Sequence, residues 1–334
     1  MKRTTSPAIT LGILAAGSIG LSFLATWFGT ISIQALPAWG EYFTIPNAEW
    51  SQDARILSLR IPRMILAWIA GGALATAGAV VQTLLRNSLA TPYTLGIASA
   101  GSFGAFLALA VPSLAIFGGL SSVIFSLTTS LLCLLIVLRI ARSSRRADGL
   151  LLAGITLNFL FGAGVMFVRY LADPFQLATM ERWMLGSLNA VQMETALAPM
   201  PWVIAGLIII ITHIPALDQL AFDEEVAAAR GIRVQRAKAI LLLGAGLLTA
   251  GVVAYTGPIG FLGLLIPHAV RWFTGLRHGI LIPASFLAGG AFLVLADLLA
   301  RTLELGGRNS ELPVGIVTAM VGGPFFLALL IRDH

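Results

Sequence analysis

Apolar stretches as long as a bilayer is thick recur along the whole of this 334-residue chain. A hydrocarbon core of about 30 Å needs about 20 apolar residues in a helix, and the backbone polar groups inside it must be hydrogen-bonded within the protein. The stretches are continuous rather than alternating with a period of two, which excludes a membrane β-barrel. The sequence therefore predicts an all-α membrane protein.

Ten apolar segments can be counted, which predicts about ten transmembrane helices. The eighth segment is short and contains Pro267, so a half-span or a tilted helix is expected there. The first is too long for the apolar part of a signal peptide and lacks a clear cleavage site, so we expect it to be retained. In chain order the segments are 8–35, 61–85, 93–111, 114–140, 149–171, 199–214, 237–255, 259–272, 280–300 and 313–331.

Charge is sparse, since 11% of the residues are charged against about 25% in a soluble domain. The net charge of +6 would suggest nucleic acid binding in a soluble protein, but the arginines here gather between apolar segments. With the N-terminus placed in the cytoplasm, fourteen lysines and arginines lie inside and seven outside, as the positive-inside rule requires. We therefore expect a multi-pass protein of the bacterial inner (plasma) membrane, with both termini cytoplasmic, lipid around it and no nucleic acid partner.

Three connections are long enough to hold structure of their own. Residues 36–59 and 172–198 are expected outside, the second with a short amphipathic helix at about 175–188. Residues 215–236 are expected inside and form the most polar stretch of the chain. Because no linker or shift in composition divides the sequence, we predict a single transmembrane domain over residues 1–334.

The residues of an enzymatic centre do not come together in this sequence. The only lysines, Lys2 and Lys238, stand outside any Gly-Lys-Ser/Thr phosphate loop, and the four scattered histidines offer no metal-binding pair. We thus expect no catalytic residue, no bound metal and no cofactor. Asp297 lies four residues before Arg301 in the ninth segment, which favours an ion pair at a helix end over an ion-coupling site.

Several short runs match a known family, in order, from about residue 55 to the end of the chain. The first is Arg60-Ile61-Pro62-Arg63, followed by Gly71-Gly72-Ala73-Leu74-Ala75 and Arg86-Asn87-Ser88-Leu89-Ala90. The carboxyl-terminal half adds Gly257-Pro258-Ile259-Gly260-Phe261-Leu262-Gly263, Glu311-Leu312-Pro313-Val314-Gly315 and Gly323-Pro324-Phe325-Phe326. The chain thereby resembles the FecCD family, the transmembrane permeases of type II ABC importers for iron-siderophores, haem and cobalamin.

The resemblance implies a cobalamin-permease-like fold of ten helices that carries an iron-siderophore or a related metal chelate inward as a dimer. It also implies three partners: an ATP-binding cassette subunit that holds the ATP and Mg, a periplasmic or lipoprotein substrate-binding protein, and a second permease copy or paralogue. The cargo could be a ferric siderophore, haem, cobalamin or an oxyanion, and the choice between a copy and a paralogue stays open.

The same resemblance gives roles to the polar inner loop and to the segment after the second span. In the family, two short helices of the inner loop dock on the ATPase, although a charged loop is usually just solvated. Residues 87–90 match the family's inner gate loop. The matching loop residues are Asp218, Asp223, Glu224, Glu225, Arg230 and Gly231, and the gate residues are Asn87, Ser88, Leu89 and Ala90.

On the outer face, the resemblance implies that Arg60, Arg63 and Arg301 receive acidic residues of the substrate-binding protein. Arg60 and Arg63 flank Pro62, which we expect in the first turn of the second span. The alternatives are that these arginines reach lipid phosphates, or that Asp297 holds Arg301.

Two polar residues of the fifth span, Thr156 and Asn158, are candidates for lining the transport pathway. Hydrogen bonds that pack helices together explain them equally well. The family's pathway lies on the axis between two subunits, so the spans that face this axis are expected to line it.

Three residues depart from the family pattern: Ser88 replaces a proline, and Asp223 and Arg230 each replace one residue of a Leu-Gly pair. The rival class, a secondary transporter driven by an ion gradient, would need buried acidic residues, and these are largely absent. A membrane scaffold or enzyme would need a catalytic cluster, which the sequence does not offer.

Overall fold

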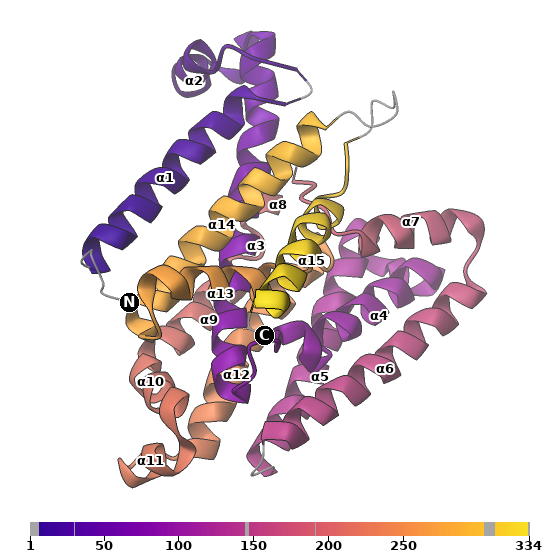
Figure 1. Cartoon of the computed structure of the whole chain (residues 1–334). Coiled ribbons are helices and arrows are strands. Elements are labelled where there is room, and N and C mark those ends of the chain that lie inside the picture. The colour runs from indigo at the N-terminus through magenta and orange to yellow at the C-terminus, as the bar shows by residue number, and fades with distance from the viewer. Residues whose placement is uncertain (1–6, 30, 144–146, 191, 304–310, 333–334) are drawn as a thin grey trace.

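The computed structural model describes residues 7–29, 31–143, 147–190, 192–303 and 311–332. Within these ranges every regular element is a helix (Figure 1). Seven helical stretches are long and apolar enough to cross a membrane. Five of them lie within α1 (Pro7–Trp27), α3 (Gln52–Leu85), α6 (Ala147–Leu171), α12 (Val234–Thr256) and α14 (His278–Thr302). The other two, Ile116–Arg142 and Met193–Thr212, begin before α5 (Ser121–Ser143) and α9 (Met200–Thr212) and include the short helical residues that precede them.

Three shorter helices complete the match to the ten predicted segments. They are α4 (Ile97–Ala110), α13 (Leu262–Thr274), which contains Pro267, and α15 (Val314–Arg332). The eighth segment was predicted to be a half-span or a tilted helix, and α13 has 13 residues, which at 1.5 Å per residue is too short for a perpendicular crossing. The predicted all-α membrane fold is therefore confirmed.

The remaining helices lie in the connections. The long connection between α1 and α3 holds α2 (Ala35–Thr44) and η1 (Asn47–Glu49), and the polar loop holds α10 (Ile214–Phe222) and α11 (Glu224–Ala229). The others are η2 (Pro92–Leu95), η3 (Pro112–Leu120), α7 (Pro174–Met184) and α8 (Met193–Leu197). Figure 1 places α2 at one end of the molecule and α10 and α11 at the opposite end. We call these two ends the α2 end and the α10 end.

The first two predicted spans differ from the helices observed. α1 ends at Trp27 instead of residue 35, and α3 begins at Gln52, nine residues before the predicted start. The hydroxyl of Ser51 caps α3 by accepting a hydrogen bond from the backbone N–H of Ala54 at 3.3 Å. The expectation that Pro62 lies in the first helical turn is therefore wrong, since Pro62 is inside α3.

Helix α3 is the buried axis of the bundle and packs against α12, α13 and α14. Its glycines allow this close packing, since a methyl group at Gly71 would overlap the carbonyl oxygen of Gly289 on α14. A methyl group at Gly78 would likewise overlap the carbonyl of Gly263 on α13. Small residues let helix backbones approach where no hydrophobic effect drives helices together in lipid. These glycines thus serve the packing of α3 against its neighbours.

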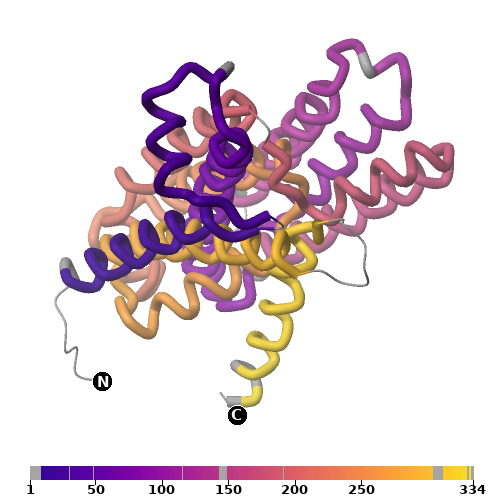
Figure 2. Tube along the Cα trace, turned by 90° about the horizontal axis from the view of Figure 1, so that it is seen from above, coloured from indigo at the N-terminus to yellow at the C-terminus, as the bar shows by residue number. Residues whose placement is uncertain are grey.

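Helices α4 to α7 form a second group beside this axis. Helix α4 packs against α5, α6 and α7. Figures 1 and 2, viewed at right angles, both place this group on the side of the molecule opposite α1. Helix α7 covers the predicted amphipathic helix at about 175–188, and Asp173 caps it by accepting hydrogen bonds from Phe175 and Gln176. That local prediction is confirmed to within a few residues.

Candidate functional site

Charged side chains gather near the α2 end, between α3, α14 and the start of α15. The Nε of Arg63 lies 2.7 Å from Oδ1 of Asp297, and the Nε of Arg301 lies 3.0 Å from Oδ2 of the same carboxylate. A second nitrogen of Arg63 pairs with Glu311. Together with Arg60, these residues form what we call the charge cluster. It holds three positive and two negative side chains, so one positive charge is left over.

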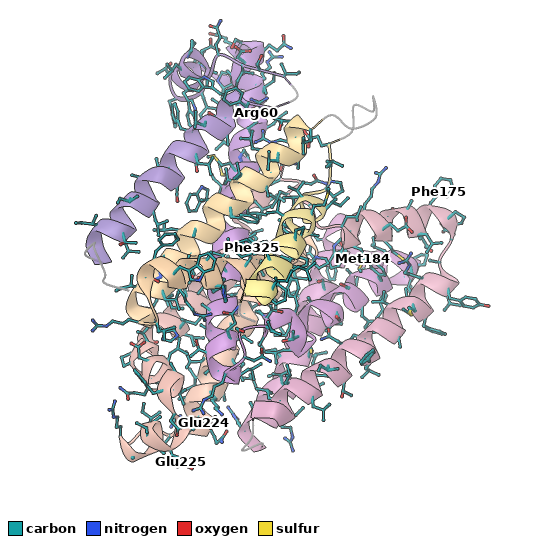
Figure 3. The ribbon with its side chains drawn as sticks, viewed as in Figure 1. Arg60, Phe175, Met184, Glu224, Glu225 and Phe325 are labelled. Atoms are coloured by element: carbon teal, nitrogen blue, oxygen red, sulfur yellow. The ribbon has the colours of Figure 1, made fainter. Side chains whose placement is uncertain are left out.

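Arg60 is buried, with 8% of its surface exposed. Its Nη1 donates to the carbonyl of Thr26 at 2.7 Å and of Trp27 at 3.3 Å, and its Nη2 donates to the carbonyl of Ile31. The last carbonyls of a helix lack partners within the helix, so Arg60 caps the end of α1. Figure 3 shows Arg60 near the α2 end of the molecule. Its role in docking a partner stays a prediction, one that would require the guanidinium to leave these carbonyls.

The ion pair between Asp297 and Arg301, expected from their spacing, is present. Both side chains are almost fully buried, and the Nη1 of Arg301 has no hydrogen-bond partner among the residues that the structure describes. The spacing did not reveal that Asp297 also binds Arg63. One carboxylate therefore stabilises two guanidinium groups, the buried one of Arg301 and the partly buried one of Arg63.

Two cavities adjoin the charge cluster. One of about 230 Å³ is lined by its three arginines and Glu311, together with Gly29, Ile31, Ile56 and Leu59. The other has a volume of about 570 Å³ and contacts Arg63 and Glu311 at one side. It extends to α7, with Thr179, Arg182, Trp183, Ser187 and Asn189 among its lining residues. Arg63 and Glu311 thus stand between the two cavities.

At the α10 end, the polar loop folds into two short helices, α10 and α11. Asp223 begins α11, because its Oδ1 accepts a hydrogen bond from the backbone N–H of Glu225 at 2.7 Å. This bond, helped by Arg86, lowers the pKa of the Asp223 carboxyl below its usual value. Gly231 follows with a φ of 85°, a left-handed conformation that favours glycine.

Two other charged residues of the loop have partners within the protein, and a third is exposed. Glu224 pairs with Lys238 of α12, and Arg230 bonds to the side-chain oxygen of Gln219 on α10. Glu225 is exposed. Figure 3 shows Glu224 and Glu225 at the end of the molecule opposite Arg60. The loop therefore presents a folded, charged surface.

The segment predicted as a gate, residues 87–90, directly follows α3. Asn87 folds it into a turn, since its side-chain oxygen accepts from the backbone N–H of Leu89 at 2.8 Å. Ser88 and Leu89 are exposed, whereas Ala90 is buried. Arg86, just before the turn, has a φ of 49° and reaches Oδ2 of Asp223 at 3.3 Å.

The two candidate pathway residues on α6 differ. Asn158 is used in packing, because its amide nitrogen donates to the carbonyl of Tyr93 at 3.0 Å and its oxygen accepts from the hydroxyl of Ser99 at 2.6 Å. Thr156 is exposed and bonds only to its own helix at Leu152, 2.9 Å away, among the bonds that the structure gives for it. Thr156 remains a candidate for the pathway, and Asn158 holds η2 against α6.

The structure shows two buried polar groups that the sequence did not indicate. Gln82 of α3 accepts a hydrogen bond from Arg271 at 2.6 Å and donates to the carbonyl of Gly263 at 3.0 Å. His278, which begins α14, binds Asp218 of the polar loop. Each pair joins residues at least 60 positions apart, so no local spacing could have revealed it.

The chain is thus a bundle of membrane-spanning helices with a charged loop at one end and a charge cluster at the other. Residues 13–332 match the model of the FecCD transport family. The chain therefore belongs to the FecCD family, and it is the permease type of subunit that this family contributes to ABC importers.

Relatives cover nearly the whole chain. An ABC transporter permease protein of Bacillus subtilis, YvrB, is 37% identical over 96% of this chain and 94% of its own length. The hemin transport system permease protein HmuU of Yersinia pestis is 34% identical over 100% and 98%. A solved structure named as an inward-facing conformation of a metal-chelate type ABC transporter superposes with a TM-score of 0.83, at 26% identity, over 98% of this chain and 100% of its own.

Proposed function

We propose that this chain carries an iron-siderophore or a related metal chelate, such as haem or cobalamin, inward across the bacterial inner membrane. The observation that carries the proposal is the family match over residues 13–332. Relatives that are at least 34% identical over the aligned residues include permease proteins named for hemin and for cobalamin. A third relative, 30% identical over 99% of the chain, is named for iron(3+)-hydroxamate import.

The energy for transport comes, in this proposal, from ATP and Mg bound by a separate ATPase subunit, and this chain binds no cofactor or metal. The ATPase docks on α10 and α11, over Asp218, Asp223, Glu224, Glu225, Arg230 and Gly231. Two short helices beside each other are suited to entering a groove on a partner. This surface lies at the cytoplasmic end, where the count of positive residues also places both termini.

The substrate-binding protein docks at the α2 end, and two permease chains, either copies or paralogues, enclose the pathway. Of the three arginines proposed to bind the receptor's carboxylates, Arg63 is the most accessible, with 16% of its side chain exposed. Arg60 and Arg301 support it from within the charge cluster. The single surplus positive charge of the cluster favours an acidic partner.

The rival function, a carrier driven by an ion gradient, requires an acidic group that can take up and release an ion within the membrane. Among the residues that the structure describes, Asp297 is the buried acidic side chain, with 2% of its surface exposed. Two arginines neutralise it, which leaves it poorly suited to this task.

The test is uptake into proteoliposomes that hold the permease, the ATPase encoded with it and the substrate-binding protein. Hemin, cyanocobalamin and a ferric hydroxamate are offered in turn, with and without ATP. We expect ATP-dependent uptake of one of these compounds and none with a non-hydrolysable ATP analogue. Uptake that follows a proton or sodium gradient without ATP would support the rival carrier.

A further inference from the structure

The inner end of α3 is joined to the polar loop by two separate chains of polar contacts. The first is the ion pair between Arg86 and Asp223, whose Nη1 and Oδ2 lie 3.3 Å apart. Asp223 also caps α11 through the backbone N–H of Glu225. One carboxylate thus fixes the start of α11 and holds Arg86, the residue that leads into the gate segment, residues 87–90.

The second chain runs through His278. The backbone N–H of His278 donates to Oδ1 of Asp218 at 2.8 Å, and its Nδ1 lies 2.7 Å from the same oxygen. Its Nε2 lies 2.9 Å from the hydroxyl of Thr83, in the last turn of α3. Only 2% of His278 is exposed, and its ring joins α10 to α3 by direct contacts.

The two chains begin on different helices of the loop and end on the same turn of α3. Asp218 belongs to α10 and Asp223 begins α11, while Thr83 and Arg86 are three residues apart. The gate segment follows this turn without a flexible break, because the N–H of Asn87 donates to the carbonyl of Gln82 at 3.1 Å. A displacement of the loop must therefore move the start of the gate segment or break both contacts.

We propose that Arg86 and His278 are positioning residues that transmit a displacement of the loop helices α10 and α11 to the gate segment. The inference rests on the proposed docking of an ATPase on this loop and on the predicted role of residues 87–90 as a gate. In it, nucleotide binding by the ATPase shifts α10 and α11, and the two polar links carry the shift to residues 87–90.

The ion pair has the properties of a linkage rather than of a support for the fold. Its side chains are 40% and 43% exposed, and exposed ion pairs add little to stability. Removing it should therefore leave the folded protein intact while changing how the gate segment follows the loop. His278 is buried and supports the fold as well, so the ion pair offers the cleaner test.

The experiment follows the gate segment with a spin label at Leu89, which is 46% exposed. The label is attached to Leu89→Cys in a Cys133→Ala background, since Cys133 is the only native cysteine. The permease is purified with its ATPase, and the spectrum of the label is recorded before and after ATP and vanadate are added. This measurement needs no transported cargo.

Three variants of the link are compared. Asp223→Asn keeps a side chain that can cap α11 but removes the negative charge. Arg86→Asp reverses the charge of the partner residue. The exchange Arg86→Asp/Asp223→Arg restores an ion pair with the two charges swapped. Each single variant should reduce the nucleotide-induced change about fivefold or more, the lower end of usual coupling effects, and the exchange should recover it. Thr83→Val, combined with Arg86→Asp, removes both links and should abolish the change.

The matched control is Arg169→Asp, which breaks an ion pair of similar exposure with Glu181 at 3.1 Å, away from the gate segment. It should leave the response unchanged, and Arg86→Asp and Arg169→Asp should co-purify with the ATPase and melt near the wild-type temperature. Because Asp223 also lies on the proposed docking surface, its variants are compared as purified complexes with the same amount of bound ATPase as the wild type. Single variants that respond like the wild type would overturn the inference. A wild-type complex whose label ignores nucleotide would instead count against the proposed docking of the ATPase on this loop.

Discussion

The Nε of Arg63 on α3 lies 2.7 Å from Oδ1 of Asp297 on α14, across 234 positions of sequence. These two helices form the most extensive helix pair in the bundle. Their glycines bring the backbones close, and the ion pair fixes one helix along the other at the α2 end. Packing and charge thus define the same interface, and the charge cluster is part of the fold as well as a candidate docking surface.

Replacing Asp297 with alanine should destabilise the protein strongly. Arg63 and Arg301 would then lose their shared carboxylate, and Arg301 is 7% exposed. Breaking a buried ion pair on one side costs about 3–5 kcal/mol, because a buried charge is left without a partner. Thermal unfolding of the purified variant in detergent measures the effect. Glu311→Gln is the control, since this partially exposed partner of Arg63 should contribute about 1 kcal/mol or less. Equal melting temperatures for the two variants would contradict the assignment.

Replacing Arg60 with alanine should loosen the end of α1. The carbonyls of Thr26, Trp27 and Ile31 would lose their donor, and a hydrogen bond to a charged group contributes about 1.5–3 kcal/mol. We expect a lower melting temperature and faster proteolysis between α1 and α2. Arg55→Ala, an exposed arginine on the same helix, is the matched control and should behave like the wild type. If only Arg60→Ala weakens receptor binding at unchanged stability, Arg60 acts in docking instead.

Replacing Gly78 with alanine should separate α3 from α13. The added methyl group would overlap the backbone carbonyl of Gly263, which cannot move aside as a flexible side chain could. Overpacking of this kind costs about 1–3 kcal/mol or more. Gly12→Ala on α1 is the control, because nothing lies within 4 Å of a methyl group there. The amount of monodisperse protein after extraction and heating compares the two, and equal amounts would contradict the close packing of α3 and α13.

The link through Asp223 should not depend on pH near neutrality. The N–H of Glu225, and to a smaller extent Arg86, lower the pKa of Asp223. A carboxyl group whose pKa is lowered by folding stabilises the folded contact at pH values above its pKa in the unfolded chain, about 3.9 for aspartate. This stabilisation is lost as the pH falls through the pKa in the folded protein. The nucleotide response of the label at Leu89 should therefore be constant from about pH 8 to about pH 6. A response that falls within this window in the wild type but not in Asp223→Asn would show that Asp223 titrates there.

The sequence predicts the buried helices more accurately than their polar ends. The prediction for α12 was 237–255 and the helix spans Val234–Thr256, because a long apolar run determines both. The start of α3 was missed because Asp53, Arg55 and Arg60 lower the hydropathy of its first turns. Those turns are stabilised by contacts with α1, α2 and α14, which only the folded chain contains.

The same distinction holds for the charged residues. The pair of Asp297 with Arg301 was predicted because four residues separate them on one helix. The pairs of Arg63 with Asp297 and of Arg86 with Asp223 depend on how distant helices pack, so the sequence gives no sign of them. Asp223 was noted as a departure from the family pattern, and the structure gives this departure a partner in Arg86.

Glu311 occupies the position on Arg63 that a receptor carboxylate would need. Glu311 is 41% exposed and pairs with the most accessible arginine of the charge cluster. A receptor carboxylate that binds Arg63 must displace Glu311, so Glu311→Gln should raise the affinity for the substrate-binding protein. An exposed pair of this kind is worth up to about 1 kcal/mol, which corresponds to an affinity gain of about fivefold.

Binding of the purified receptor to the permease in nanodiscs, measured at low and high salt, checks this. The gain should shrink at high salt, because screening weakens both the internal pair and its competitor. Arg63→Ala should lose affinity, and adding Glu311→Gln to it should change nothing further, because the two substitutions act on one contact. Glu181→Gln, which breaks the exposed pair with Arg169, is the control for a general change of charge. An affinity that rises equally in Glu181→Gln and Glu311→Gln would assign the effect to net charge and remove Arg63 from the docking surface.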